Sequence, residues 1–116
     1  MIAAALALSL SLSAPQSAPT HQEALTCTGV FLFAGLVMAQ QAEQNPSPEA
    51  DETVEVAARL MKAADDDRLA AATREGVTTD QSGEALTAWI QANLETAQET
   101  MGRELDPCLS RYASAI

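Results

Sequence analysis

The longest uncharged stretch after the N-terminal region runs from Ala24 to Ala42, 19 positions, and holds both phenylalanines of the chain. Its apolar residues fall on all sides of a helix, which indicates burial on most sides. Just ahead of it, Thr20 and Glu23 have the spacing of a capping box, in which two residues close the first turn of a helix. The pattern therefore predicts a central first helix from about His21 to Gln44.

Asn45-Pro-Ser-Pro48 interrupts the helical pattern, and a second helical region is predicted from Pro48 onward. Ser47 is a suitable N-cap, and proline suits the first helical turn. Three consecutive aspartates, Asp65 to Asp67, repel one another and are poor helix formers, so we expect this region to split there. Gly76 is expected to end it as a C-cap glycine. The positions expected to face inward are Val54, Ala57, Leu60, Met61 and Ala64.

A third helix has the clearest amphipathic pattern in the chain. It follows a polar loop from 77 to 83, in which Asp80 or Ser82 is the expected N-cap. Apolar residues then step by three or four positions along one stripe. The stripe consists of Leu86, Trp89, Ile90, Leu94, Ala97, Met101 and Leu105. Asp106 and Pro107 predict the start of a short last helix that carries Cys108.

The first twenty residues have the pattern of a secretory signal peptide. Met1 to Leu12 are mostly apolar, no side chain up to residue 20 is charged, and prolines at 15 and 19 end the apolar core. We expect cleavage between Gln16 and His21, which leaves residues 21–116 as a single α-helical domain. The alternatives are a membrane anchor or a buried helix, but this core is shorter than the ~20 residues that span a bilayer.

The chain has two cysteines, Cys27 and Cys108. In an exported protein, two cysteines most simply form one disulfide. A metal site would need more ligands than the single histidine adds, and no C-x-x-C redox motif occurs. We therefore expect a structural disulfide between Cys27 and Cys108, with a bond between two chains as the alternative. The protein is expected to be periplasmic or secreted.

This disulfide restricts the path of the chain. If three long helices ran up, down and up, Cys108 would lie about 25 Å from Cys27, farther than the few residues after the third helix can reach. The third helix is therefore expected to run antiparallel to the first. A reversal of the chain at Asp65–Asp67 is the simplest way to achieve this. An extended crossing by residues 76–83 is the less favoured route.

The composition favours a helical protein and excludes some partners. Alanine, leucine, glutamate and glutamine are plentiful, and aromatic residues make up 3% of the chain. Sixteen acidic and six basic residues give a net charge of −10, which disfavours binding to nucleic acids and to anionic membranes. We predict an all-α fold: a small bundle of three to four helices plus a short C-terminal helix, tied by one disulfide.

The sequence offers no convincing site for catalysis, a cofactor or a metal. Asp65–Asp67 are interpreted as a solvated turn, because neighbouring helical side chains point about 100° apart and do not converge on one cation. His21 is expected to be exposed, and Trp89 to be a core residue rather than a binding anchor. The methionines are interpreted as gap-fillers, and Tyr112 as packed with its hydroxyl at the surface. Motifs of the common enzyme classes do not occur, so we do not expect an enzyme.

Three functional hypotheses follow. The first is a small exported helical-bundle protein that acts as a non-catalytic binding or interaction module for a protein partner. The second is an acid-responsive periplasmic chaperone, because the chain is similar in size, helix content, export and its single disulfide to small acid-stress chaperones, and because its carboxylates lose charge in acid. The third is a membrane protein with a single span at Ala24–Ala42, a marginal length that two glutamines weaken further.

Overall fold

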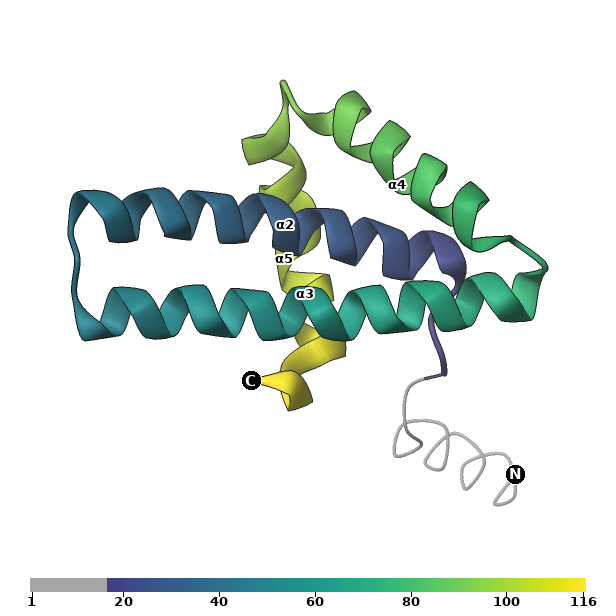
Figure 1. Cartoon of the computed structure of the whole chain (residues 1–116), viewed down its shortest axis with the longest axis horizontal. Helices are drawn as coiled ribbons and strands as arrows, with labels where there is room; N and C mark the ends of the chain where they lie inside the picture. The colour runs from purple at the N-terminus through teal and green to yellow at the C-terminus, as the bar shows by residue number, and fades with distance from the viewer. Residues whose placement is uncertain (1–16) are drawn as a thin grey trace, which may run out of the picture.

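The computed structural model describes residues 17–116, which are arranged as shown in Figure 1. The predicted all-α bundle tied by one disulfide is confirmed, and residues 17–116 contain helices and no strand. The predicted signal peptide falls mostly on residues 1–16, which lie outside the described part. The elements are α2 (His21–Gln44), α3 (Pro48–Glu75), α4 (Thr79–Asn93), α5 (Ala97–Tyr112) and a 3₁₀ turn, η1 (Ala113–Ala115).

The first helix, α2, has the bounds that the sequence predicts. Thr20 Oγ1 accepts a hydrogen bond from the Glu23 backbone N–H at 3.1 Å, and the Glu23 carboxylate accepts one from the Thr20 N–H at 3.0 Å. This capping box satisfies backbone donors that a helix start leaves free. Pro19 is buried just ahead of it, and its carbonyl accepts a hydrogen bond from Arg74 at 2.9 Å. Pro19 and Thr20 therefore belong to the packed fold.

α2 and α3 form a long antiparallel hairpin (Figure 1). Ser47 caps α3 by accepting a hydrogen bond from the Ala50 N–H at 3.0 Å, and Gly76 ends the helix with a φ of 74°. Both caps are as predicted. Small residues let the two helices approach closely, because Gly35 on α2 faces Ala57 on α3. Buried alanines recur every seven residues along α3, at Ala57, Ala64 and Ala71.

The predicted break at Asp65–Asp67 is wrong, because α3 runs through it without interruption. Each aspartate has its own partner. The Asp65 carboxylate pairs with Arg68 at 2.8 Å, Asp66 pairs with Lys62 at 2.9 Å, and Asp67 accepts a hydrogen bond from the hydroxyl of a distant tyrosine at 2.9 Å. These contacts offset the mutual repulsion and the low helix propensity of the triplet. The three side chains also point to three separate partners, so they do not form a cation site.

The predicted third helix breaks instead, between α4 and α5. Asn93 ends α4: its side-chain amide donates to the Trp89 carbonyl at 2.8 Å and its side-chain oxygen accepts from the Thr100 hydroxyl at 2.9 Å. Leu94 lies at the corner and is 61% exposed. The stripe of apolar residues therefore spans two helices. The last helix begins at Ala97 rather than at Pro107, which lies inside α5.

The expectation that the third helix runs antiparallel to the first is also wrong. In Figure 1, α4 returns from the end of α3 in the same sense as α2, and α5 then crosses the hairpin at a steep angle. The corner after Asn93 makes this crossing possible. It brings Cys108 to Cys27 within one chain without any reversal of the second helical region.

The core gathers where α5 crosses the hairpin. Its buried cluster joins Phe31 of α2 with Leu60 and Ala64 of α3, the disulfide, and Tyr112 of α5. The Phe31 and Tyr112 rings meet edge to face, with centroids 6.0 Å apart. Beyond this crossing, the closed end of the hairpin extends with no third helix of residues 17–116 beside it (Figure 1).

The contact between α2 and α4 depends on a glycine. The Trp89 ring lies directly against Gly29, where a Cβ atom would overlap the indole and lie 2.9 Å from its Cη2 atom. Trp89 also stacks on Phe33, with ring centroids 5.4 Å apart at an angle of 30°. The indole is half-buried, so Trp89 fills the interface between two helices rather than the centre of the core.

Replacing Gly29 with alanine is expected to displace the Trp89 ring and lower the free energy of unfolding by about 1 kcal/mol, because the clash outweighs the gain in helix propensity. Intrinsic fluorescence reports this directly, since Trp89 is the one tryptophan in the chain, and its emission should shift to the red. Gly35→Ala is the matched control: its Cβ would lie 3.7 Å from that of Ala57, an ordinary contact, so stability should stay equal or rise. Equal effects of the two substitutions would contradict the packing described.

Candidate functional site

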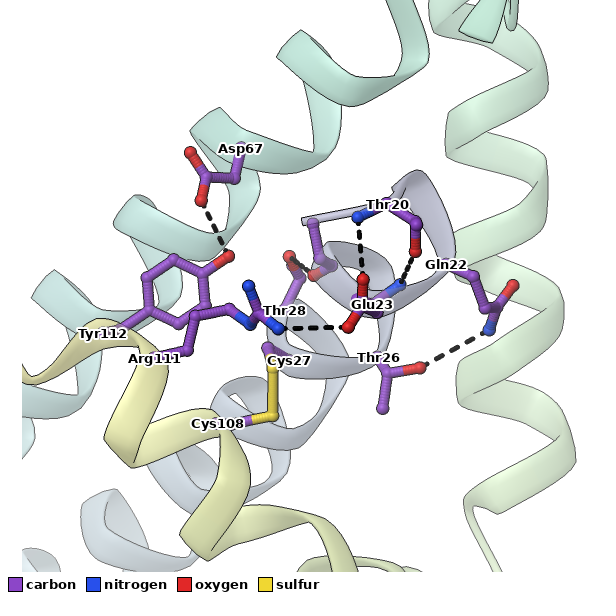
Figure 2. The surroundings of a disulfide bond; sticks show 11 residues. Thr20, Gln22, Glu23, Thr26, Cys27, Thr28, Asp67, Cys108, Arg111 and Tyr112 are labelled. Carbon is purple, nitrogen blue, oxygen red and sulfur yellow. Dashed lines mark hydrogen bonds and ion pairs between the residues drawn. A yellow bond between two sulfur atoms is a disulfide. The ribbon is translucent and has the colours of Figure 1, made fainter. Parts of the chain in front are cut away.

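The disulfide lies at the centre of a clasp that fastens α5 to the hairpin (Figure 2). Cys27 and Cys108 are joined across 81 positions, with their Cα atoms 5.4 Å apart. One turn further along α5, Arg111 pairs with Glu23 of α2 at 3.0 Å. The Tyr112 hydroxyl completes the clasp by donating to Asp67 of α3. We call these six residues, Glu23, Cys27, Asp67, Cys108, Arg111 and Tyr112, the α5 clasp.

Two groups of the clasp have shifted pKa values. Hydrogen bonds from Thr20 and then the Arg111 guanidinium hold the pKa of Glu23 below its ordinary value. Burial, followed by the hydrogen bond to Asp67 and the charge of that carboxylate, raises the pKa of Tyr112 well above its ordinary value of 10.0. The clasp therefore holds a charged carboxylate and a neutral phenol at neutral pH.

Tyr112 gives a direct test of the clasp, since it is the one tyrosine in the chain. Its folded-state pKa is raised, so the stability it contributes is complete below pH 10.0 and is lost as the pH rises toward the folded value. Phenolate absorbance should therefore rise well above pH 10.0 in the native protein and near 10.0 in the unfolded protein. Asp67→Asn should lower the native midpoint. A native midpoint equal to the unfolded one would contradict the contact.

A second cluster of polar side chains lies at the open end of the hairpin. Arg68 donates to Ser82 Oγ at 2.6 Å, and the same oxygen lies 2.7 Å from His21 Nε2. Arg68 also pairs with Asp65, and the His21 backbone N–H donates to Glu75 at 2.7 Å. This cluster links α2, α3 and α4. His21 is 8% exposed, so the prediction that it is exposed is wrong: the chain folds back over it and supplies a buried partner.

The hydrogen-bonded Ser82 and His21 have the residue types of a nucleophile and its base. Their surroundings do not fit catalysis. Ser82 has no exposed surface, and its oxygen already accepts a hydrogen bond from Arg68, so a substrate would have to open the fold to reach it. We interpret the pair as part of a satisfied buried network. Sequence reasoning missed it because the residues lie 61 positions apart.

The closed end of the hairpin carries the largest exposed apolar residues of α2, Leu36 at 56% and Val37 at 40%. Next to them lies a hollow of about 170 Å³ between α2 and α3, which we call the tip groove. Its lining is apolar throughout: Phe31, Leu32, Gly35, Leu36, Val54, Ala57, Ala58 and Met61. Val54 and Met61 were predicted to face inward, and they are half-buried because neither α4 nor α5 covers them.

A smaller apolar hollow of about 120 Å³ shares two lining residues, Phe31 and Ala57, with the tip groove. The contact between these two residues separates the hollows, so the second hollow lies on the other side of it. Leu105 and Leu109 of α5 cover this second hollow. No residue of α4 or α5 lines the tip groove. The hairpin is thus covered by α5 on one face and open on the face that holds the groove.

Acidic residues outnumber basic ones near the tip groove. From Ala24 to Met61, which includes all the residues that line the groove, the chain has five carboxylates and one basic residue, Arg59. Within residues 17–116, the ion pairs found involve none of these five. The five are Glu43, Glu49, Asp51, Glu52 and Glu55, all exposed. The tip groove is therefore an apolar hollow with a net negative charge around it.

By length and composition, α2 could also cross a membrane, but half of its most apolar window is buried inside the fold. A core helix has the same properties. Among residues 17–116, no three His, Cys, Asp or Glu side chains are grouped closely enough to hold a metal ion. No protein-family model, curated protein or solved structure matches the chain.

Proposed function

We propose that this chain is a small exported protein that acts without catalysis, as a binding module whose contact surface is the tip groove. The observation that carries the proposal is the combination of an apolar groove with exposed Leu36 and Val37 on a part of the hairpin that neither α4 nor α5 covers. Exposed apolar grooves of this kind are typical of interaction sites in soluble proteins. The absence of an accessible reactive group at the buried Ser82 and His21 also supports a binding role over a catalytic one.

Export is part of the proposal. A structural disulfide indicates an oxidising environment, since cytosolic thiols are kept reduced. The signal-like pattern of the first twenty residues favours the periplasm or secretion. Intact mass of the protein from the periplasm or medium, with and without reductant, tests both points. We expect cleavage on the N-terminal side of Pro19, which retains the N-cap of α2, Thr20. We also expect the mass to increase by about two daltons on reduction of the disulfide.

Photo-crosslinking tests the binding surface. A photoreactive amino acid at Leu36 of the full chain should give a discrete adduct with a partner in the native compartment. The same amino acid at Thr87, which is exposed on α4 away from the hairpin tip, is the control and should give none. Adducts of equal yield at both positions would show non-specific contact and would contradict a binding role for the tip groove.

The α5 clasp favours a second candidate, an acid-responsive chaperone. Glu23 and Asp67 both tie the end of α5 to the hairpin. The pKa of Glu23 is lowered in the fold, so the stability it contributes is present above its ordinary value of 4.5 and is lost as the pH falls below it. Protonation of Glu23 would then loosen α5 around the disulfide and uncover the apolar hollow beneath Leu105 and Leu109.

This second candidate predicts a chaperone activity that depends on pH. The protein should suppress aggregation of an unfolded client at about pH 2 to 3 and have no effect at pH 7. Binding of a fluorescent dye that reports exposed apolar surface should increase over the same pH range. No protection in acid, or equal protection at both pH values, would contradict an acid-triggered mechanism.

A further inference from the structure

The tip groove has the shape of an incomplete three-helix bundle. Leu32 and Leu36 on α2 face Val54, Ala58 and Met61 on α3, so each helix presents residues three or four positions apart to the same groove. A third helix laid in this groove would pack its side chains between these rows. An extended peptide would not fit as well, because helical walls offer no free backbone groups to pair with a strand.

The charges around the groove determine which charge the polar face of such a helix should carry. Asp51 and Glu55 lie three positions before Val54 and Ala58, so they follow the same face of α3. Glu43 lies seven positions after Leu36, two turns along α2 on the groove side. All three carboxylates are exposed, and within residues 17–116 none has an ion-pair partner. Two basic residues also lie on this stretch of α3. Arg59 is exposed and follows Glu55 by four positions, and Lys62 is paired with Asp66.

We propose that the tip groove binds a basic amphipathic helix of a partner protein, with leucine-like residues in the groove and lysine or arginine against Glu43, Asp51 and Glu55. This inference rests on the proposed function and adds the chemistry of the partner. Complementary charge on the partner steers the encounter and fixes its orientation. The groove spans about two helical turns, from Val54 to Met61, which fits a small, transient interface.

The same charges exclude two other occupants. A second copy of this chain would bring two acidic rims together, and like charges across an interface oppose association. An anionic membrane surface would be repelled by the same five carboxylates. A basic helix is the occupant that satisfies both the apolar lining and the acidic rim.

The test uses a synthetic helical peptide of about 18 residues, with leucine on one face and lysine on the other, and a companion with glutamine in place of lysine. Binding to the disulfide-bonded protein is measured by calorimetry at two salt concentrations. The lysine peptide should bind one to one, about tenfold more tightly than the glutamine peptide, and its affinity should fall as salt rises.

Three variants locate the site. Glu43→Gln, Asp51→Asn and Glu55→Gln together should weaken the lysine peptide about tenfold. The matched control neutralises three exposed carboxylates on or beside α4 and α5, with Glu84→Gln, Glu95→Gln and Glu99→Gln, and should change affinity less than about twofold. Leu36→Gln should weaken both peptides about fivefold or more, because an apolar contact is lost. Circular dichroism checks that each variant is folded.

The outcomes distinguish an error in the proposed partner from an error in the proposed function. If the glutamine peptide binds as tightly as the lysine peptide and both depend on Leu36, the groove is a binding site but the basic partner is wrong. If Leu36→Gln changes neither affinity, or neither peptide binds, both the partner and the proposed function are overturned. If the control triple variant weakens binding as much as the groove variant, the attraction is non-specific and the inference is overturned.

Discussion

Replacing Cys27 and Cys108 together with alanine is expected to lower the free energy of unfolding by about 4 to 5 kcal/mol. The disulfide closes a loop across 81 positions, and in the chain-entropy model a loop of this size removes that much conformational freedom from the unfolded chain. A loss of this size is a large share of the roughly 5 to 15 kcal/mol that stabilises a folded domain. Urea titrations of the two proteins, monitored by circular dichroism, measure the difference.

Reduction of the unmodified protein provides the control for this first prediction. Dithiothreitol should lower its urea midpoint to nearly that of the double alanine variant, because both lack the same bond. In both cases α5 should be the first helix to open, since Arg111 and Tyr112 then hold its end to the hairpin without covalent support. A loss below about 1 kcal/mol would show that helix packing fixes α5 without the disulfide.

Replacing Arg68 with methionine is expected to lower the free energy of unfolding by about 2 to 4 kcal/mol. Arg68 is buried and gives hydrogen bonds to Ser82 and Asp65, so its removal leaves a fully buried hydroxyl and a half-buried carboxylate with fewer partners. Removing one member of such a buried charged network is among the more costly substitutions. Methionine keeps most of the side-chain length, so the measured loss reports mainly the polar contacts.

Arg103→Met is the matched control, because Arg103 is exposed and pairs with its own neighbour, Glu104. Its effect should stay within about 0.5 kcal/mol. A double-mutant cycle with Ser82→Ala isolates the contact itself: Arg68→Met should cost about 1 kcal/mol less once the serine hydroxyl is absent. Strict additivity of the two substitutions would contradict a direct interaction between Arg68 and Ser82.

The helix ends that the sequence predicts accurately are set by local chemistry. The Thr20–Glu23 capping box, Ser47 with Pro48, and Gly76 each act within a few residues of a helix end, so their effects can be read from neighbouring letters. The disulfide could also be predicted, because the chain has two cysteines and therefore one possible pairing within it. Fold class and the bounds of α2 and α3 follow from such local signals.

The errors have local as well as distant causes, and one of them is the start of α4, where a capping box of Thr78 and Gln81 replaces the expected cap at Asp80 or Ser82. Asp65 to Asp67 lack helix propensity, but Arg68, Lys62 and Tyr112 supply partners, and Tyr112 lies 45 positions from Asp67. The break after Asn93 had a local signal, an asparagine followed by Thr96, yet the apolar stripe continued across it and favoured one long helix.

The tip groove could not have been located from the sequence. Its apolar residues resemble ordinary core positions, and the fact that α5 crosses the hairpin short of the tip appears only in three dimensions. The acidic residues from Glu43 to Glu55 are apparent in the sequence, but their position relative to Leu36 depends on how α2 and α3 fold back on each other. Side-chain chemistry could be listed from the sequence, whereas the shared surface required the fold.

The wide separation of the two cysteines also sets an order of events during biosynthesis. Cys27 is synthesised 81 positions before Cys108, so it must stay a free thiol until the chain that forms α5 has emerged. The α2–α3 hairpin ends at Glu75, well before Cys108, and can form in that interval. Since the chain offers Cys27 no other intramolecular partner, premature oxidation would link two molecules. Covalent dimers in rapidly oxidised preparations would then mark chains that were trapped before α5 crossed the hairpin.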